Sequence, residues 1–139
     1  MAAQPASVDP HTPVVLVIDD EDYVADMVAT ALGLEGYIVH VAYNGRQGFE
    51  RAHSLSVDLV IIDLMMPYLG GEELAARLRE DRQAGEVPII LISAGASPQQ
   101  LLDGITFVAK PFDIGRLLAL VEARIGRPPD GRAAQRAEQ

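Results

Sequence analysis

The sequence of 139 residues predicts an α/β fold, an open three-layer α/β/α sandwich built on a five-stranded parallel sheet. Five short apolar runs are spread along the chain, and runs of this length are typical of strands that are covered on both faces. Between these runs, apolar residues recur every three or four positions, which is the period of a helix. Strands that alternate with helices indicate parallel pairing, and five such units are too few for an eight-stranded barrel.

The strands are expected at the apolar runs themselves. The first run, "VVLVI" at residues 14–18, is β-branched and ends at an aspartate. The other four strands are expected at residues 37–42, 59–62, 88–92 and 105–109. Of these, only the 37–42 run is mixed in polarity, so we expect the other four strands to be covered by helices on both faces.

A helix is predicted after each strand. The first helix begins near Asp22 and ends before Gly36, because glycine is common just after a helix C-terminus. Asn44 is expected to cap the second helix, since its side chain can accept a hydrogen bond from a helical N–H group. The remaining helices are marked by Leu74 and Leu78, by Ser97-Pro98 with Gly104, and by Ile114, Leu117, Leu118, Val121 and Ile125.

Composition excludes several classes of function. The formal net charge of −9 argues against direct contact with nucleic acid through a basic face. The chain has no cysteine, so disulfides and thiolate metal sites are excluded. The apolar runs are too short to cross a bilayer, and the start of the chain lacks the pattern of a secretory signal. We therefore expect a cytoplasmic protein without membrane contact.

The two ends of the chain are expected to be disordered, which leaves one domain at residues 13–126. Residues 1–12 are rich in alanine, proline and polar residues. Residues 127–139 contain Pro128-Pro129 and, apart from proline, no apolar residue larger than alanine. Such segments bury too little apolar surface to offset the entropy cost of ordering them.

Polar residues follow four of the five predicted strands. Asp19 and Asp20 come after the first strand, Asp63 after the third, Ser93 after the fourth and Lys110 after the fifth. The carboxyl ends of parallel strands meet at one edge of the sheet, which is where ligands bind in open α/β folds. We therefore expect these five side chains to form one site.

This set of side chains suits a divalent cation and a phosphate. Two like charges about 4 Å apart repel by roughly 4 kcal/mol at an effective dielectric constant near 20, and a hard cation such as Mg²⁺ (or Mn²⁺) removes that repulsion. Lys110 and Ser93 in addition suit an anion that is bound to the metal, with phosphate as the natural candidate. Asp63 is then a candidate phosphoryl acceptor through its carboxylate.

Four pieces of the sequence, in this order, resemble the receiver domain of bacterial two-component response regulators. The pieces are "VLVIDDED", "DLVIIDLMMP", "IILISA" and "KPF", and the resemblance spans residues 13–125. It implies a chemotaxis-regulator-like, flavodoxin-like strand order of 2-1-3-4-5. The 17 positions between Ser93 and Lys110 (110 − 93) are fewer than is usual in this family, so we expect a short fourth helix.

The resemblance also implies a role for each site residue. Asp63 is the phosphorylated residue, and the metal is bound by Asp19, Asp20, Asp63 and the backbone carbonyl of Met65. Ser93 and Lys110 bind the phosphoryl group, Ser93 and Phe107 act as the switch pair, and Pro111 follows a cis peptide bond. The phosphoryl donor is a sensor histidine kinase or a phosphotransfer protein, and the output is an altered surface for an unidentified downstream protein. Such a domain is no enzyme beyond its own phosphorylation and dephosphorylation.

Two other functions compete with this interpretation. One is a degenerate receiver that serves only as a protein-binding module, although every chemical position is filled. The other is a metal-dependent phosphatase with an aspartyl nucleophile, which needs a second aspartate at the position of Met65.

Some residues near the motifs have simpler interpretations. Glu21 and Asp22 suit the first turn of a helix, where the helix dipole favours negative charge. Met65 and Met66 are expected to pack against apolar neighbours.

Overall fold

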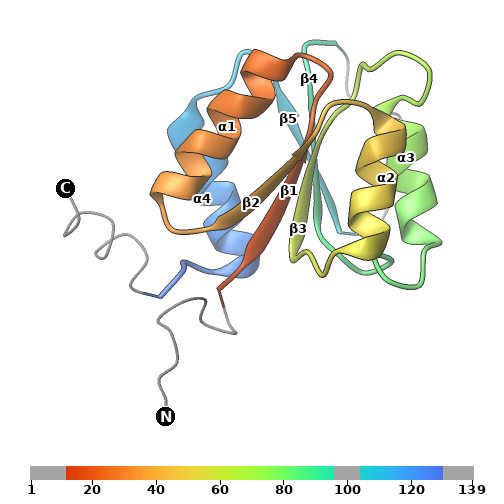
Figure 1. Ribbon diagram of the computed structural model, residues 1–139. Helices are drawn as coiled ribbons and strands as arrows, with labels where there is room; N and C mark the ends of the chain where they lie inside the picture. Colours follow the sequence, from red (N-terminus) through yellow and green to blue (C-terminus); the bar gives the residue numbers. More distant parts are fainter. Residues whose placement is uncertain (1–11, 96–103, 130–139) are drawn as a thin grey trace.

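The protein folds around one five-stranded parallel sheet with the strand order β2-β1-β3-β4-β5 (Figure 1), which confirms the predicted α/β fold. The computed structural model describes residues 12–95 and 104–129. The strands are β1 (Val14–Ile18), β2 (Ile38–Ala42), β3 (Leu59–Asp63), β4 (Ile89–Ser93) and β5 (Ile105–Ala109). Asp63 and Ser93 were expected just after their strands, and each is instead the last strand residue, because Asp63 pairs with Ile92 and Ser93 pairs with Ala109.

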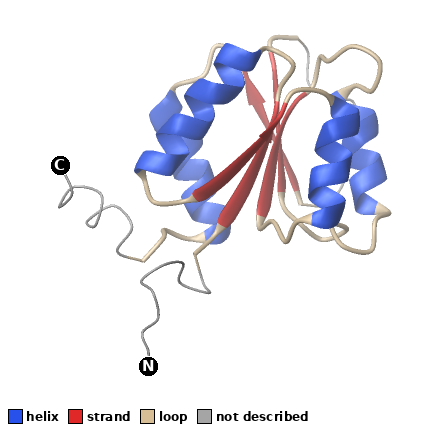
Figure 2. Ribbon diagram, viewed as in Figure 1, coloured by secondary structure: helices blue, strands red, loops and turns tan. Residues whose placement is uncertain are grey.

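Helices cover both faces of the sheet, which gives the predicted three layers (Figures 1 and 2). The helices are α1 (Asp22–Leu34), α2 (Gly45–Ser54), α3 (Gly71–Arg79) and α4 (Ile114–Ile125). Helices α1 and α4 lie on one face and α2 and α3 on the other (Figure 1). The short helix expected between Ser97 and Gly104 lies outside the described residues, so α4 is the helix that was predicted last.

The core consists of two clusters, one on each face of the sheet. Successive side chains of a strand point to opposite faces. Accordingly, Leu16 and Ile18 of β1 belong to the cluster under α2 and α3, whereas Val15 and Val17 belong to the cluster under α1 and α4. The fully apolar strands are therefore buried from both sides, which is what holds the carboxyl edge of the sheet in place.

Local contacts support the helix positions that the sequence indicated. The side chain of Asn44 accepts a hydrogen bond of 2.8 Å from the backbone N–H of Gln47, which confirms the predicted cap of α2. Helix α2 packs closely on β1, because a Cβ atom added at Gly48 would lie 2.5 Å from Cδ1 of Ile18. Ile18 directly precedes Asp19, so this contact helps to fix the end of β1.

One packing expectation was wrong. Met66 is buried, but the side chain of Met65 is 69% exposed, because the chain turns away from the core after β3. Among the described residues, no helix has the length and the apolar character needed to span a lipid bilayer.

Candidate functional site: an acidic cluster with a lysine

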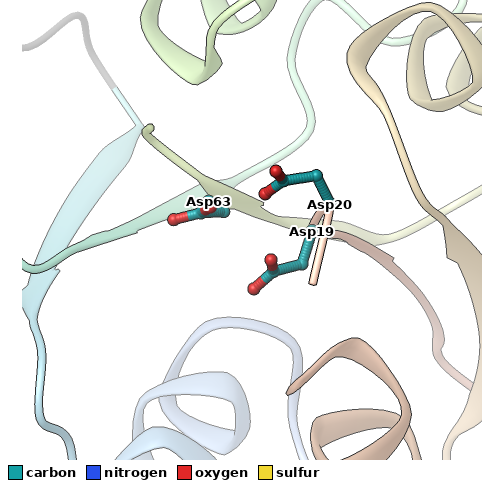
Figure 3. Close-up of side chains that lie close together, drawn as sticks. All are labelled: Asp19, Asp20 and Asp63. Atoms are coloured by element: carbon teal, nitrogen blue, oxygen red, sulfur yellow. The ribbon is translucent and has the colours of Figure 1, made fainter. Parts of the chain in front are cut away.

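Three aspartates converge at the carboxyl edge of the sheet. Asp19 and Asp20 follow β1, and Asp63 ends the neighbouring strand β3. One carboxylate oxygen from each residue lies within 4.8 Å of those of the other two, and Figure 3 shows the three side chains close together. Asp19 and Asp63 are buried, with 6% and 5% of their surface exposed, whereas Asp20 is exposed.

Backbone hydrogen bonds hold Asp19 in this arrangement. Its N–H group donates to the carbonyl of Ala42 at 3.1 Å, which continues the pairing of β1 with β2 beyond the end of the strand. Its Oδ1 atom accepts a hydrogen bond of 2.9 Å from the N–H group of Glu21. The carboxylate is therefore fixed by the start of α1 and directed towards β3.

Burial and mutual repulsion change the acidity of this cluster. Burial and, after it, the negative charge of Asp19 together raise the pKa of the Asp63 carboxyl to about 6. Burial also raises the pKa of Asp19, although the hydrogen bond from Glu21 acts in the opposite direction. Without a metal ion, the cluster therefore holds its negative charges at a cost in free energy.

Lys110 provides the positive charge of the site. Its Nζ atom lies 3.5 Å from Oδ1 of Asp63 and 3.7 Å from Oε1 of Glu21, and its side chain is 21% exposed. Burial opposes the charge of the ammonium group, but the surrounding carboxylates, led by Asp63, outweigh burial and raise the pKa of Lys110. The peptide bond to Pro111 is cis.

Ser93 lies at the same edge, between the acidic cluster and β5. It is completely buried, and its Oγ atom accepts a hydrogen bond of 3.0 Å from the N–H group of Gly95. Its carbonyl oxygen accepts a hydrogen bond of 2.8 Å from the N–H group of Lys110. The backbone thus ties the end of β4 to the residue that carries the ammonium group.

Phe107 lies further from the edge, on β5, opposite Leu91 of β4. It is half-buried and packs against the core cluster under α2 and α3. The two residues chosen as a switch pair, Ser93 and Phe107, therefore belong to adjacent strands.

The structure brings together four of the predicted site residues, Asp19, Asp20, Asp63 and Lys110. It also adds Glu21, which the sequence had placed only in the first turn of a helix. The side chain of Glu21 reaches Lys110 and makes no capping hydrogen bond to α1. The sequence signal for this role is weak, because it consists only of a third acid in "DDED".

The residues present fit a hard divalent cation. Three carboxylates from two neighbouring strands offer oxygen ligands at close range, and Mg²⁺ is bound in proteins through one or two carboxylates together with water. The raised pKa of Asp63 also suits a cation site, because a bound cation would offset both the burial of the carboxylate, which is the main cause of the shift, and the repulsion from Asp19.

The fold and the site together define a class of protein. Asp20 follows β1 and Asp63 ends β3. The order of a 2-1-3-4-5 sheet reverses between these two strands, and this switch point is the usual ligand site of the flavodoxin-like α/β class. Within that class, the chain belongs to the response regulator receiver domain family, whose family model matches residues 15–122. A receiver domain of this family is the phosphoacceptor part of a two-component system.

Curated relatives support the same assignment. The chain is 33% identical over 120 residues to the DNA-binding dual master transcriptional regulator RpaA of a Synechocystis strain, covering 83% of this chain and 50% of RpaA. It is 35% identical over 121 residues to the response regulator ArlR of Staphylococcus epidermidis, covering 84% of this chain and 54% of ArlR. The chain thus spans about half the length of the curated relatives that it matches.

Solved structures show the same fold over nearly all of their own length. The receiver domain of the Francisella response regulator 1452 is 31% identical, with a TM-score of 0.73, covering 82% of this chain and 97% of that chain. The receiver domain of the Pseudomonas aeruginosa sensor histidine kinase PA1611, described with a magnesium ion in its active site cleft, has a TM-score of 0.70 at 24% identity. It covers 83% of this chain and 98% of that chain, and it supports the fold alone.

Proposed function

We propose that the protein takes a phosphoryl group onto Asp63 from a sensor histidine kinase or a phosphotransfer protein. The observation that carries this proposal is the position of Asp63, which is buried at the end of the central strand between two further carboxylates and an ammonium group. An acceptor must be held rigidly while negative charge gathers around it, because phosphoryl transfer depends mainly on positioning and charge neutralisation.

In the transfer step, a bond forms between a carboxylate oxygen of Asp63 and the phosphorus atom of the donor. The bond from phosphorus to the donor's imidazole nitrogen breaks, and its electron pair stays on that nitrogen. Lys110, already 3.5 Å from Oδ1 of Asp63, is positioned to bind a phosphoryl oxygen. Hydrogen bonds between charged groups are stronger than those between neutral groups, so Lys110 favours the product as well as the incoming group.

Asp19, Asp20, Asp63 and the backbone carbonyl of Met65 are the groups that we propose to hold a Mg²⁺ or Mn²⁺ ion. The bound ion would neutralise the charge of the cluster and stabilise the negative charge of the phosphoryl oxygens. Asp63 must be deprotonated to act as acceptor, and a bound cation favours its carboxylate form.

The output is a change in the protein's surface, and Ser93 and Phe107 are the proposed switch residues. In the structure described here, Oγ of Ser93 accepts a hydrogen bond from Gly95. We propose that the phosphoryl group on Asp63 attracts this hydroxyl, and that Phe107 moves into the space that Ser93 leaves. A ligand group that favours one of two conformations shifts their populations.

The partner that reads this change is proposed to be a protein. The net charge of −9 disfavours direct contact with nucleic acid. The prediction of no nucleic-acid contact is not confirmed by the relatives, because RpaA is named as DNA-binding; that name describes a protein of which this chain matches half.

The proposal is tested by incubating the protein with Mg²⁺ and acetyl phosphate and measuring its intact mass. We expect a gain of one phosphoryl group, which EDTA and Asp63→Asn both abolish. Asp58→Asn is the matched control, because Asp58 precedes the same strand at its opposite end and binds the N–H group of Val14. A mass gain that survives Asp63→Asn would refute the assignment of the acceptor.

A further inference from the structure

Lys110 has two carboxylate partners, and only one of them is the proposed phosphoryl acceptor. Its Nζ atom lies 3.5 Å from Oδ1 of Asp63 and 3.7 Å from Oε1 of Glu21. Asp63 is fixed at the end of a buried strand, whereas the side chain of Glu21 is 48% exposed and comes from the residue just before α1. The ammonium group is therefore shared between a fixed buried partner and a partner at the surface.

We propose that Glu21 is a positioning residue that competes with the phosphoryl group for Lys110 and so limits how strongly the site retains that group. This inference rests on the proposed function, since it concerns the regulation of the same site. The carboxylate of Glu21 attracts the ammonium group on which the phosphoryl oxygens depend. It also adds a negative charge close to a group that is itself negatively charged.

The structure separates this role from a role in folding. Glu21 occupies the position before the first turn of α1, but its side chain makes no capping hydrogen bond. The contact between Glu21 and Asp19 is made by the backbone N–H group, so it does not depend on the side chain. Replacing Glu21 by glutamine therefore removes the charge and leaves the fixed position of Asp19 unchanged.

The size of the effect follows from the exposure of the pair. Partly exposed ion pairs contribute little free energy, so the effect of removing this one should be small. We expect Glu21→Gln to raise both the rate of phosphorylation by acetyl phosphate and the lifetime of the acyl phosphate by about two- to five-fold. At 1 M salt, charges interact over only about 3 Å, so the difference from the wild type should shrink there. A purely structural effect of the substitution would not depend on salt in this way.

Glu50→Gln is the matched control. Glu50 lies on α2 and pairs with Arg46 at 3.7 Å, the same distance that separates Glu21 from Lys110. The two substitutions change the charge of the protein equally. If both variants gain equally in rate and lifetime, the effect comes from net charge and the proposal is wrong.

A second measurement observes Lys110 directly. Lys110 is the only lysine in the chain, so protein labelled with carbon-13 lysine gives the signals of one lysine side chain in NMR spectra. We expect Glu21→Gln to shift the signals of the carbon next to Nζ in the unphosphorylated protein, and Glu50→Gln to leave them unchanged. Unshifted signals would show that the ion pair with Glu21 does not form in solution and would overturn the proposal.

The two measurements separate failure of this inference from failure of the proposed function. If the wild type gains no phosphoryl group at all, the proposed function fails, and the NMR comparison still tests the pairing of Lys110 with Glu21. If the wild type is phosphorylated and Glu21→Gln has the same or a lower rate and lifetime, only the competition by Glu21 is refuted. A lower rate would mean instead that Glu21 holds Lys110 in its working position.

Discussion

Nζ of Lys110 lies 3.5 Å from Oδ1 of Asp63, although β4 separates the strands that carry the two residues. The contact spans two strand spacings of the sheet, a distance that the side chains of lysine and aspartate cover together with the 3.5 Å between them. Beneath it, the N–H group of Lys110 is bonded to the carbonyl oxygen of Ser93 on the intervening strand. The three strand ends are therefore coupled to one another through Lys110.

We predict that Lys110→Gln slows phosphorylation of Asp63 by at least about ten-fold, which corresponds to about 1.4 kcal/mol of lost stabilisation. Glutamine keeps much of the length of lysine but has no charge to offer the phosphoryl oxygens. The rate is measured from intact mass after mixing with acetyl phosphate. Arg127→Gln is the control, because Arg127 is exposed and pairs with Glu122. A rate equal to that of the wild type would contradict the role of Lys110.

We predict that Asp63→Asn stabilises the protein at pH 8 in EDTA. The pKa of Asp63 is about 6 in the folded protein and 3.8 in a model peptide, so the folded state binds the proton more tightly. The contribution of Asp63 to the free energy of unfolding therefore falls as pH rises from 4 to 6. Above pH 6 the carboxyl is charged in both states, and the full cost of burying that charge remains. Allowing for solvent screening, Asp63→Asn should raise the free energy of unfolding at pH 8 by on the order of 1–2 kcal/mol.

The measurement for this pH prediction is urea unfolding of both proteins at pH 8 and pH 4. The gain from Asp63→Asn should largely disappear at pH 4, where the wild-type carboxyl is protonated in the folded state. A gain of equal size at both pH values would show that the charge of Asp63 is not its cause.

Mg²⁺ is expected to raise the midpoint of thermal unfolding of the wild type, because a ligand that binds only the folded state stabilises it by mass action. At one hundred times the dissociation constant, the gain is about 2.7 kcal/mol. Asp20→Asn should need more Mg²⁺ for the same shift, since Asp20 offers one of the three clustered carboxylates. Asp58→Asn, at the opposite end of the sheet, should behave as the wild type does, and an unaltered response of Asp20→Asn would contradict the proposed ligand set.

Gly48→Ala should destabilise the fold by about 1–3 kcal/mol, the usual cost of forcing extra volume into a packed core. The new methyl group would lie 2.5 Å from Cδ1 of Ile18, a side chain that is fully buried in the core. The measurement is the midpoint of urea unfolding.

Gly33→Ala is the matched control for Gly48→Ala. Gly33 also lies in a helix, but a Cβ atom placed there meets no atom within 4 Å. Alanine is favoured over glycine in a helix by about 0.5–1 kcal/mol, so this variant should be more stable than the wild type. If both variants were destabilised equally, the packing argument for Gly48 would be refuted.

Much of the fold was predictable because its signals are local. Each strand lies within one residue of the apolar run that predicted it, and the cap at Asn44 follows from the chemistry of one side chain and the N–H group three residues later. The acidic cluster was also predictable, because a parallel sheet brings Asp20 and Asp63 to the same edge independently of the conformation of the loops.

Contacts that depend on side-chain direction in the loops were not predictable. Glu21 has a sufficient local explanation in the helix dipole, and nothing in the sequence indicates that it also reaches Lys110. His53 and Asp81 form a contact of 2.7 Å, although they are 28 residues apart on segments that only the tertiary fold brings together. The outward orientation of Met65 is likewise set by the turn after β3, which apolar character alone does not reveal.

All five residues of β3 are buried, and the strand is hydrogen-bonded to β1 on one side and to β4 on the other. Asp63 is therefore held from both sides of its strand, and its backbone has little freedom to shift when its charge changes. The segment that follows β3 lies nearer the surface, and its Tyr68 projects fully into solvent with a left-handed φ of 66°. The central strand therefore fixes Asp63 in place, so we expect a change of charge there to move the side chains and loops around it, including the hydroxyl of Ser93.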